Sequence, residues 1–299
     1  MLKNPAKIVM CGCHEAGYHL IRALLENGLS FSHFVSLTPE QADRFSVFGY
    51  RDFSDLAQEY TIPLYYPEDY SLKTMHDQTF FRKNKFDLLI QGGWQRLFPP
   101  EVLATIRLGA LGIHGSSDFL PKGRGRSPLN WSLIEGKKRF IIHLFFIRAG
   151  IDNGDIIDTE TFDITEFDTI RTLYMKNFIL TKRMILKNLP GILNETVRPR
   201  PQVGEPTYYP KRSPEDGLID WETMDVWQIY NFIRAQTKPY PGAFGFIQGK
   251  KIKIWHGQVF DTRITYADAG YGDCVEKIDG NLIINCRGGL LLVDDYDVS

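Results

Sequence analysis

The segment from Leu111 to Asp155 contains most of the side chains in this sequence that are suited to acid–base chemistry. His114 follows a short apolar run, and a histidine exchanges protons near neutral pH. Asp152 stands in a glycine-flanked turn, from which a carboxylate can orient an imidazole and hold it protonated. A lone histidine is more often a surface or capping residue. His114 and Asp152 together, however, predict a catalytic unit that transfers protons or stabilises an oxyanion.

A basic loop broken by glycines follows the histidine along the chain. It contains Lys122, Arg124 and Arg126, and it leads into Ser127 and Pro128, which suit the start of a helix. Arginines beside a helix N-terminus favour an anion such as phosphate or carboxylate. The sequence therefore predicts a loop that binds the anionic part of a substrate. The competing interpretation is a solvated loop in front of a capped helix.

The elements that must position these residues alternate between strand and helix. Apolar runs bounded by turn residues predict strands at residues 7–11, 33–37, 86–90, 110–113, 140–148 and 156–164. Helical spacing and start signals predict helices at residues 15–27, 52–60, from 99 onward, 127–134 and 170–185. The alternation in the first half of the chain, up to the strand at 110–113, predicts an α/β fold with a parallel sheet and helices on both faces. Ligands in such folds bind at the carboxyl ends of the strands.

The last third of the chain has a different pattern. Residues 196–210 are rich in proline and predict a linker. A helix near 226–235 is followed by short β-like runs punctuated by glycine, as in a small β-barrel or sandwich. We therefore predict a catalytic domain over residues 1–195 and a smaller, mostly β domain over 211–299. A chain that ends near Pro210 is accordingly expected to fold and to retain some activity.

Composition narrows the class of protein. A formal net charge of −1 gives no reason to expect nucleic acid as a partner. The four cysteines do not form a disulfide framework in a chain of this length, which predicts a reducing compartment. Cys11, Cys13 and His14 have no second ligand cluster, so no metal site is predicted. The apolar runs are too short for a signal peptide or a membrane span, so we expect a cytoplasmic protein without a membrane partner.

These motifs resemble the formyltransferase family that uses 10-formyltetrahydrofolate. The family pattern is Asn-x-His-x-Ser, then Leu-Pro-x-x-Arg-Gly, and finally an Asp before a Gly. The sequence has Gly112-Ile-His-Gly-Ser116, the loop that begins at Leu120, and Asp152 ahead of Gly154. Later blocks, at 209–221, 239–244 and 253–255, are similar to members that formylate amino sugars. The resemblance covers most of the chain and implies a Rossmann-like formyltransferase domain.

The resemblance implies a catalytic trio of Asn, His and Asp. His114 and Asp152 match two of its positions, but Gly112 stands where the family has the Asn that helps to hold the formyl oxygen. A backbone amide or a neighbouring polar side chain would have to replace that donor, and the candidates are Ser116, Ser117, Asn130 and His143. A glycine in an apolar strand needs no special backbone angle. We therefore expect Gly112→Asn to raise the rate at least about tenfold if the donor is simply missing.

The resemblance also implies the binding residues. The co-substrate 10-formyltetrahydrofolate is expected to contact Gln91, Gly92, Gly93, Trp94, Leu97, Gly150, Ile151 and Asp155. The acceptor is expected to contact Ser116, Lys122, Arg124, Arg126 and Ser127.

A nucleotide-linked amino sugar is the acceptor that we expect, and a homodimer is compatible with the sequence. Methionyl-tRNA is the alternative acceptor. It would require a basic surface, whereas residues 38–60 carry mixed charge. A non-catalytic member of the family that has lost the Asn is the third interpretation.

Overall fold

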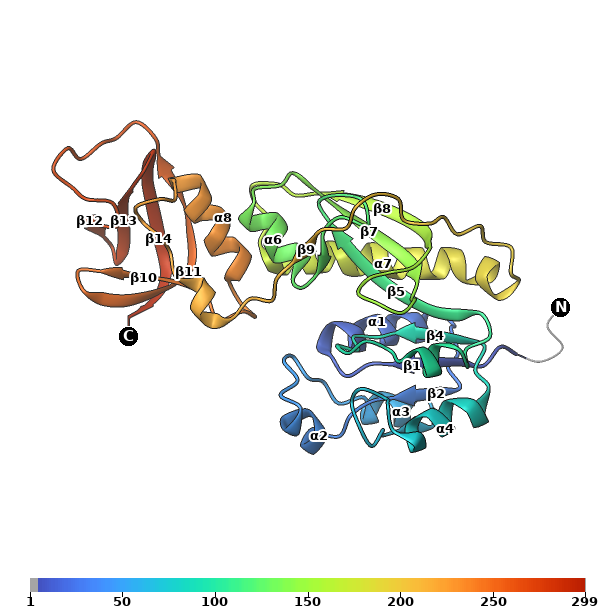
Figure 1. The fold of residues 1–299 in the computed structure, drawn as a ribbon. Helices are drawn as coiled ribbons and strands as arrows, with labels where there is room; N and C mark the ends of the chain where they lie inside the picture. The colour runs from blue at the N-terminus through green and yellow to red at the C-terminus, as the bar shows by residue number, and fades with distance from the viewer. Residues whose placement is uncertain (1–4, 299) are drawn as a thin grey trace. The chain divides into compact units, whose positions relative to one another are not determined.

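The structure is a computed structural model that describes residues 5–298, and it divides into two compact units (Figure 1). The first unit comprises the residues up to His114, residues 142–160 and residues 177–206. The second unit comprises residues 115–141, 161–176 and those from Thr207 onward. No helix within residues 5–298 has both the length and the apolar character needed to cross a membrane.

A seven-stranded sheet has the strand order β3-β2-β1-β4-β5-β7-β8. Its strands are β1 (Ile8–Cys11), β2 (His33–Val35), β3 (Leu64–Tyr65), β4 (Leu88–Gln91), β5 (Gly109–Ser116), β7 (Arg139–Phe146) and β8 (Ile156–Asp163). The pairs from β3 to β5 are parallel. The α/β prediction is confirmed, and so is the parallel sheet predicted for the first half of the chain. The complete sheet is mixed, because β8 runs antiparallel to β7. Neighbours β7 and β8 are joined by a turn too short for a crossover, so they run antiparallel.

The helices of the sheet region are α1 (Glu15–Glu26), α2 (Pro39–Arg44), α3 (Ser54–Glu59), α4 (Met75–Asn84), α5 (Pro100–Leu103) and α7 (Ile170–Leu193). Helix α1 begins where the His14 side chain accepts a hydrogen bond from the amide of Ala16. Its apolar positions recur at helical spacing and are buried, and the chain leaves the helix through Gly28 at φ +85°. α7 extends beyond the predicted range, to Leu193.

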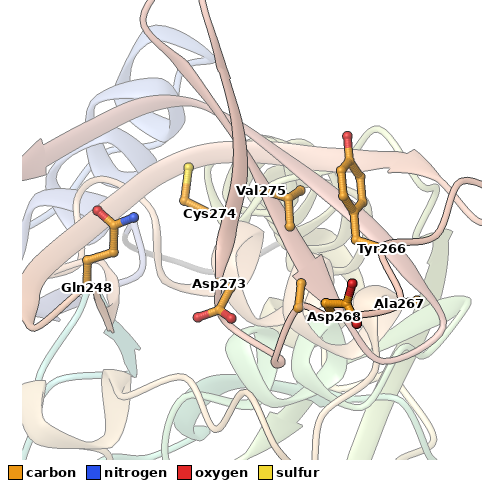
Figure 2. A pocket seen from close by; sticks show the side chains of 8 residues that line it. Gln248, Tyr266, Ala267, Asp268, Asp273, Cys274 and Val275 are labelled. Carbon is orange, nitrogen blue, oxygen red and sulfur yellow. The ribbon is translucent and has the colours of Figure 1, made fainter.

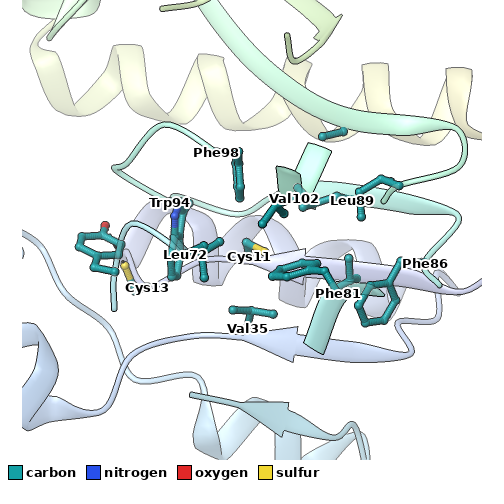
Figure 3. Packing of buried hydrophobic residues seen from close by; sticks show 14 of the residues in the cluster. Cys11, Cys13, Val35, Leu72, Phe81, Phe86, Leu89, Trp94, Phe98 and Val102 are labelled. Carbon is teal, nitrogen blue, oxygen red and sulfur yellow. Dashed lines mark hydrogen bonds between the residues drawn. The ribbon is translucent and has the colours of Figure 1, made fainter. Parts of the chain in front are cut away.

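The hydrophobic core of the first unit lies on the sheet (Figure 3). It combines strand residues such as Cys11, Val35 and Leu89 with Phe81 and Val102 from the helices. Burial raises the pKa of the Cys11 thiol well above its usual value, so this cysteine is a core residue. No group of three or more His, Cys, Asp or Glu side chains able to hold a metal occurs within residues 5–298.

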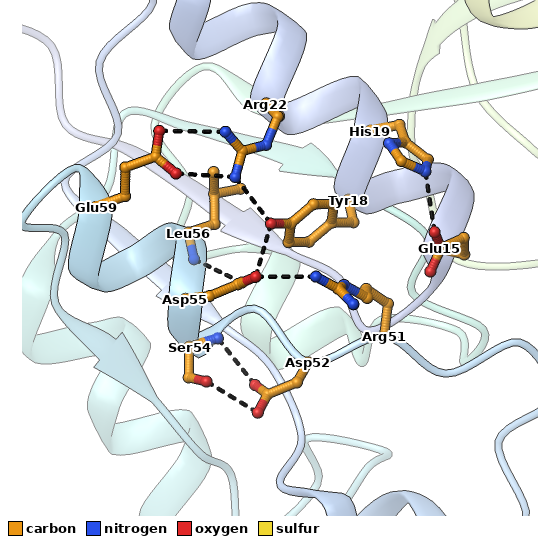
Figure 4. A network of polar contacts seen from close by, with 10 residues as sticks. All are labelled: Glu15, Tyr18, His19, Arg22, Arg51, Asp52, Ser54, Asp55, Leu56 and Glu59. Carbon is orange, nitrogen blue, oxygen red and sulfur yellow. Dashed lines mark hydrogen bonds and ion pairs between the residues drawn. The ribbon is translucent and has the colours of Figure 1, made fainter.

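A polar network joins α1 to the α3 region (Figure 4). The Tyr18 hydroxyl donates to Asp55 at 2.9 Å, and Arg22 donates both to Tyr18 and to Glu59. Arg51 donates to Asp55 and lies over the Tyr18 ring. These charges are largely exposed, so the network aligns the helices more than it stabilises them.

The second unit contains a five-stranded antiparallel sheet with the order β10-β11-β14-β13-β12. Its strands are β10 (Ala243–Ile247), β11 (Lys250–Asp261), β12 (Cys274–Ile278), β13 (Asn281–Cys286) and β14 (Gly289–Val298). Helix α8 (Val226–Gln236) begins at an Asp225–Gln228 capping box and packs its buried Ile229 and Ile233 on this sheet. The expected barrel or sandwich is therefore a single sheet with one helix, because α8 supplies the second layer of the core.

The second unit also contains the short elements β6 (Arg124–Gly125), α6 (Pro128–Ile134), β9 (Tyr208–Tyr209) and the 3-10 helix η1 (Pro214–Gly217). β9 lies inside the segment that was predicted to be a linker, and it pairs with β6. That part of the segment is a strand with a fixed partner.

Candidate functional site

His114 and Asp152 lie together in the first unit. His114 is near the carboxyl end of β5, and Asp152 is in the turn between β7 and β8. Nδ1 of His114 is 3.3 Å from Oδ2 of Asp152. The imidazole is only 8 % exposed, so little water competes with the carboxylate for it. The carboxylate is therefore placed to orient the ring.

The turn that presents Asp152 depends on backbone angles that favour glycine. Gly150 and Gly154 have φ values of +112° and +148°, and Asp152 itself adopts φ +46°. A Cβ on Gly154 would lie 1.7 Å from the carbonyl oxygen of Phe146. The side-chain amide of Gln202 donates to the carbonyls of Asp152 and Gly154, both at 2.9 Å. Gln202 lies in the predicted linker and was not identified from the sequence, because nothing in its surroundings indicates a partner.

His143 on β7 is fully buried beside this pair. Burial first, and then the charge of neighbouring His114, lower the pKa of His143 to about 4. His143 is therefore neutral at physiological pH.

Gly112 has ordinary strand geometry, as the sequence predicts, but little space. It is buried on β5 and has no positive φ. A Cβ at this position would lie 2.8 Å from Cγ1 of Ile147 and 2.9 Å from Cζ of Phe145. Apolar side chains thus occupy the space into which a side chain at residue 112 would extend.

The segment from Gln91 to Leu97 follows β4. The Gln91 side chain donates to the Trp94 carbonyl at 2.7 Å, and Gly93 has φ +84°. The Trp94 ring is 2 % exposed and packs edge-on against Tyr70, so its side chain is mainly a core residue. Its indole N–H has no hydrogen-bond acceptor among residues 5–298. A buried donor of this kind fits a site completed by a polar ligand or by water.

The other residues predicted to bind the co-substrate differ in exposure: Leu97, Gly150 and Ile151 are exposed, Asp155 is partly exposed, and Gly92 is buried. The apolar side chains of Leu97 and Ile151 are 58 % and 46 % exposed. The Asp155 carboxylate lies 3.7 Å from Arg148. The carbonyl oxygen of Gly92 lies close to α1. A Cβ on Gly17 would be only 1.7 Å from that oxygen. Glycine at position 17 therefore lets the loop approach the helix.

The basic loop of the second unit is held by pairing between β6 and β9. The Arg124 amide donates to the Thr207 carbonyl at 2.9 Å, and the Arg126 amide donates to the Tyr209 carbonyl at 3.1 Å. Lys122 and Arg126 have exposed side chains, whereas Arg124 is 9 % exposed. The three cations predicted to bind an anion are therefore not equivalent.

Two serines of this loop differ from the prediction. Ser127 does precede α6, but it adopts φ +52° and makes no capping hydrogen bond with its side chain. Its left-handed backbone turns the side chain away from the position that a cap requires. Ser116 is buried, and its hydroxyl oxygen lies 2.7 Å from the Asp118 carbonyl and 3.0 Å from the Lys122 carbonyl. Ser116 therefore holds the loop together.

A separate open hollow lies in the second unit between the loop after β11 and the start of β12 (Figure 2). It is lined by Gln248, Tyr266, Ala267, Asp268, Ala269, Asp273, Cys274 and Val275. None of the residues predicted to take part in chemistry or binding lines it.

Comparison with known proteins identifies the family. The model described as "Formyl transferase" matches residues 7–188, and "Formyl transferase, C-terminal domain" matches residues 211–297. The bifunctional polymyxin resistance protein ArnA of Wigglesworthia glossinidia brevipalpis is 33 % identical over 85 % of this chain, which spans 38 % of that longer protein. A methionyl-tRNA formyltransferase of Pelotomaculum thermopropionicum is 30 % identical over 85 % of this chain and 80 % of its own length.

A solved structure has the same fold. The N-formyltransferase from Helicobacter canadensis, in complex with folinic acid and dTDP-3-aminofucose, superposes with a TM-score of 0.65 at 18 % identity. The match covers 98 % of this chain and all of that one. Together with the family matches, which cover both the N-terminal and the C-terminal region, this confirms the resemblance seen in the sequence motifs: the chain belongs to the formyl transferase family of enzymes.

Proposed function

We propose that this enzyme transfers a formyl group from 10-formyltetrahydrofolate to the primary amine of a nucleotide-linked amino sugar. The observation that carries the proposal is the contact between His114 and Asp152, within the region that matches the formyl transferase family. A buried imidazole oriented by a carboxylate suits a reaction in which charge develops on a carbonyl oxygen and a proton must move.

The reaction forms one carbon–nitrogen bond and breaks another. The unprotonated amine attacks the formyl carbon, and the carbonyl oxygen becomes an oxyanion. An N–H group of His114 donates a hydrogen bond to that oxygen, and Asp152 keeps the imidazole oriented. The bond between the formyl carbon and N10 of the carrier then breaks. The amine loses its proton and N10 gains one, and His114 shuttles this proton, so the products are a formamide and tetrahydrofolate.

The co-substrate is proposed to bind along Gln91–Leu97 and Gly150–Asp155. The unpaired indole N–H of Trp94 and the exposed apolar side chains of Leu97 and Ile151 support this assignment. Apolar contacts with a few polar groups are typical of sites for flat heterocycles. The folinic acid bound to the Helicobacter canadensis enzyme supports a folate ligand for this fold.

The acceptor's diphosphate is proposed to bind the basic loop in the second unit. The exposed cations Lys122 and Arg126 are its main contacts, because an arginine donates to phosphate through a planar fork and a lysine as a point charge. Arg124, Ser116 and Ser127 shape the loop around them. The dTDP-3-aminofucose bound to the Helicobacter canadensis enzyme supports a nucleotide sugar as the acceptor class. The four free cysteines support a reducing, cytoplasmic location.

Methionyl-tRNA is the second candidate acceptor, since a methionyl-tRNA formyltransferase is 30 % identical over most of this chain. The net charge of −1 favours the smaller acceptor, because binding of tRNA depends on phosphate contacts.

One assay separates the two acceptors. The purified protein is given 10-formyltetrahydrofolate and either a panel of nucleotide amino sugars or methionyl-tRNA, and formamide formation is measured. We expect turnover of a nucleotide amino sugar, and Arg126→Ala should raise the acceptor KM about tenfold without changing the KM of the carrier. Arg82→Ala, at an exposed arginine on α4, is the matched control. Much faster formylation of methionyl-tRNA than of every sugar would refute the proposed acceptor.

A further inference from the structure

We infer that residues 207–212 act as a positioning segment that fixes the basic loop for the acceptor, with Tyr209 as its central side chain. The role assigned to the loop rests on the proposed function, whereas the contacts between the segment and the loop do not. This segment lies where the sequence predicts the end of a linker and the start of a second domain.

The backbone contacts are continuous along the loop. The amides of Arg124 and Arg126 donate to the carbonyls of Thr207 and Tyr209, at 2.9 and 3.1 Å. The amide of Gly123 donates to the Thr207 hydroxyl at 2.9 Å. Three of the four amides from residue 123 to residue 126 are therefore satisfied by the segment. Because a backbone donor left unpaired away from water is unfavourable, these bonds select one loop conformation.

The glycines of the loop make this approach possible. Gly123 and Gly125 have φ values of +73° and +102°, which favour glycine. A Cβ on Gly125 would lie 2.5 Å from the carbonyl oxygen of Tyr209, and one on Gly123 would lie 3.3 Å from the Tyr209 ring. The same glycines that are part of the predicted anion-binding loop therefore also allow β9 to lie against this loop.

Tyr209 joins the loop to helix α6. Its ring is stacked on Trp131, with centroids 5.6 Å apart and planes 8° apart. Its hydroxyl donates to Glu135 at 3.0 Å. Burial, followed by the hydrogen bond to Glu135, raises the pKa of Tyr209 to about 12, so the hydroxyl remains a donor at neutral pH. The guanidinium of Arg212 lies 5.1 Å from the centroid of the Trp131 ring and extends the stack.

The backbone of the loop and its basic side chains therefore have different roles. Its backbone faces the positioning segment, while the Lys122 and Arg126 side chains are exposed. Loosening the segment should therefore increase the entropy lost when an acceptor binds these cations, and should weaken binding without changing the chemical step.

The test compares three variants of the full-length protein. Tyr209→Ala removes the stack, and Tyr209→Phe keeps the stack but loses the hydroxyl. The control is Tyr271→Ala, which removes a tyrosine side chain that is 43 % exposed and lies outside the positioning segment. Hydrogen exchange is measured without ligand on peptides that cover residues 120–127, and KM and kcat are measured for both substrates. Thr207→Val, which preserves shape but removes the acceptor for the Gly123 amide, is a second probe if Tyr209→Ala does not fold.

We expect faster exchange in the loop and an acceptor KM raised about tenfold in Tyr209→Ala, the size expected for one aromatic pair, with kcat and the carrier KM within about twofold. Tyr209→Phe should behave largely like wild type, because it keeps the stack, and Tyr271→Ala should match wild type. Unchanged exchange in Tyr209→Ala and Thr207→Val would overturn the positioning role. So would faster exchange with an unchanged acceptor KM. If the wild type formylates no nucleotide amino sugar, the proposed function fails, and the exchange data still decide whether the segment holds the loop.

Discussion

The catalytic pair and the basic loop are held in place by different kinds of contact. His114 and Asp152 meet through one contact between side chains, on a strand and on the turn that follows the next strand of the sheet. The loop at residues 122–127 is held mainly by backbone hydrogen bonds to a strand more than eighty residues later in the chain.

This difference predicts which kind of change abolishes the function of each region. A change in one side chain can abolish the function of the pair while the fold persists, because the two residues meet through their side chains and not through their backbone. The loop tolerates changes in its exposed side chains but depends on residues 207–299 being present and folded. The two regions can therefore be separated by choosing between point variants and changes in chain length.

Removal of the C-terminal region should have the largest effect. A chain that ends at Pro210 keeps β9 but loses α8, which packs on α6. The buried Asn130 amide would lose its acceptor at Ala235, now 2.7 Å away, and the carbonyls of Thr165 and Asp168 would lose Arg234. Each such loss weakens folding by about 1 to 3 kcal/mol, against a total stability of about 5 to 15 kcal/mol. The structure therefore reverses the expectation that this chain folds and retains activity.

Thermal unfolding and solubility of the 1–210 chain measure this effect. Asn130→Ala in the full chain is the matched control, and it should lower the Tm by only part of the effect of truncation, since it removes the hydrogen bond to Ala235 but leaves α8 in place. A soluble 1–210 chain with a wild-type Tm and substantial activity would show that α8 does not support the loop region.

Replacement of His114 or Asp152 should have the second largest effect. His114→Ala and Asp152→Ala are each expected to lower kcat about a hundredfold or more, and the double variant should be little worse, because the two groups act through one imidazole. Steady-state kinetics with unchanged thermal melting checks this. His76→Ala, at an exposed histidine on α4, is the control and should retain full activity. Effects of the two single variants that simply multiply in the double variant would show that the residues act independently.

Much of this pair could be predicted from the sequence, because its signals are local. The apolar run before His114 and the glycines around Asp152 indicate a strand and a turn without knowledge of the rest of the chain. The direction of β7 relative to β8 was missed, since hydrophobic patterns give no strand direction. The short connection between the two strands carries that information.

The support of the loop could not be predicted in the same way. β9 has two residues in a proline-rich segment, too few to show a period of two, and it exists because β6 offers it a partner. The helix α8 and the strands near 254, 284 and 291 were predictable, but their arrangement as one sheet depends on long-range pairing. Ser127 has the residue type of an N-cap, yet its conformation is set by neighbours distant in sequence.

The neutral histidine beside the pair predicts a dependence of stability on pH. The pKa of His143, about 4, is below its value of about 6.5 in an unfolded chain, so the unfolded state binds more protons between these values. Stability is therefore lost as the pH falls through this window, by roughly 1.5 kcal/mol between pH 6.5 and pH 5 from this group alone.

Urea unfolding of wild type and His143→Leu at both pH values measures that contribution as the difference between the two proteins. His76→Leu, at an exposed histidine on α4, is the control and should follow wild type. Equal pH dependence in wild type and His143→Leu would mean that the pKa of His143 is the same in the folded and the unfolded chain.

The smallest effect is expected at Gly112, where the sequence and the structure lead to different expectations. The sequence suggests that Gly112→Asn restores a missing donor and raises the rate at least about tenfold. The backbone would allow this, because Gly112 has ordinary strand angles. The surrounding side chains would not allow it, because a Cβ at residue 112 would lie within 3 Å of both Ile147 and Phe145. The single variant should therefore lower the Tm and leave kcat unchanged or reduced.

Shortening Ile147 allows the effect of a new hydrogen-bond donor at residue 112 to be measured apart from the steric conflict with Ile147. In an Ile147→Ala background, Gly112→Asn should raise kcat about tenfold over the background, the lower end of the value of one oxyanion donor. Gly112→Ala in the same background adds the Cβ without a donor and should give no gain. Equal kcat in the Asn and Ala variants would mean that the oxyanion is already fully stabilised, and that this site needs no carboxamide at residue 112. A tenfold gain in Gly112→Asn alone, at unchanged Tm, would instead mean that Ile147 and Phe145 move aside readily.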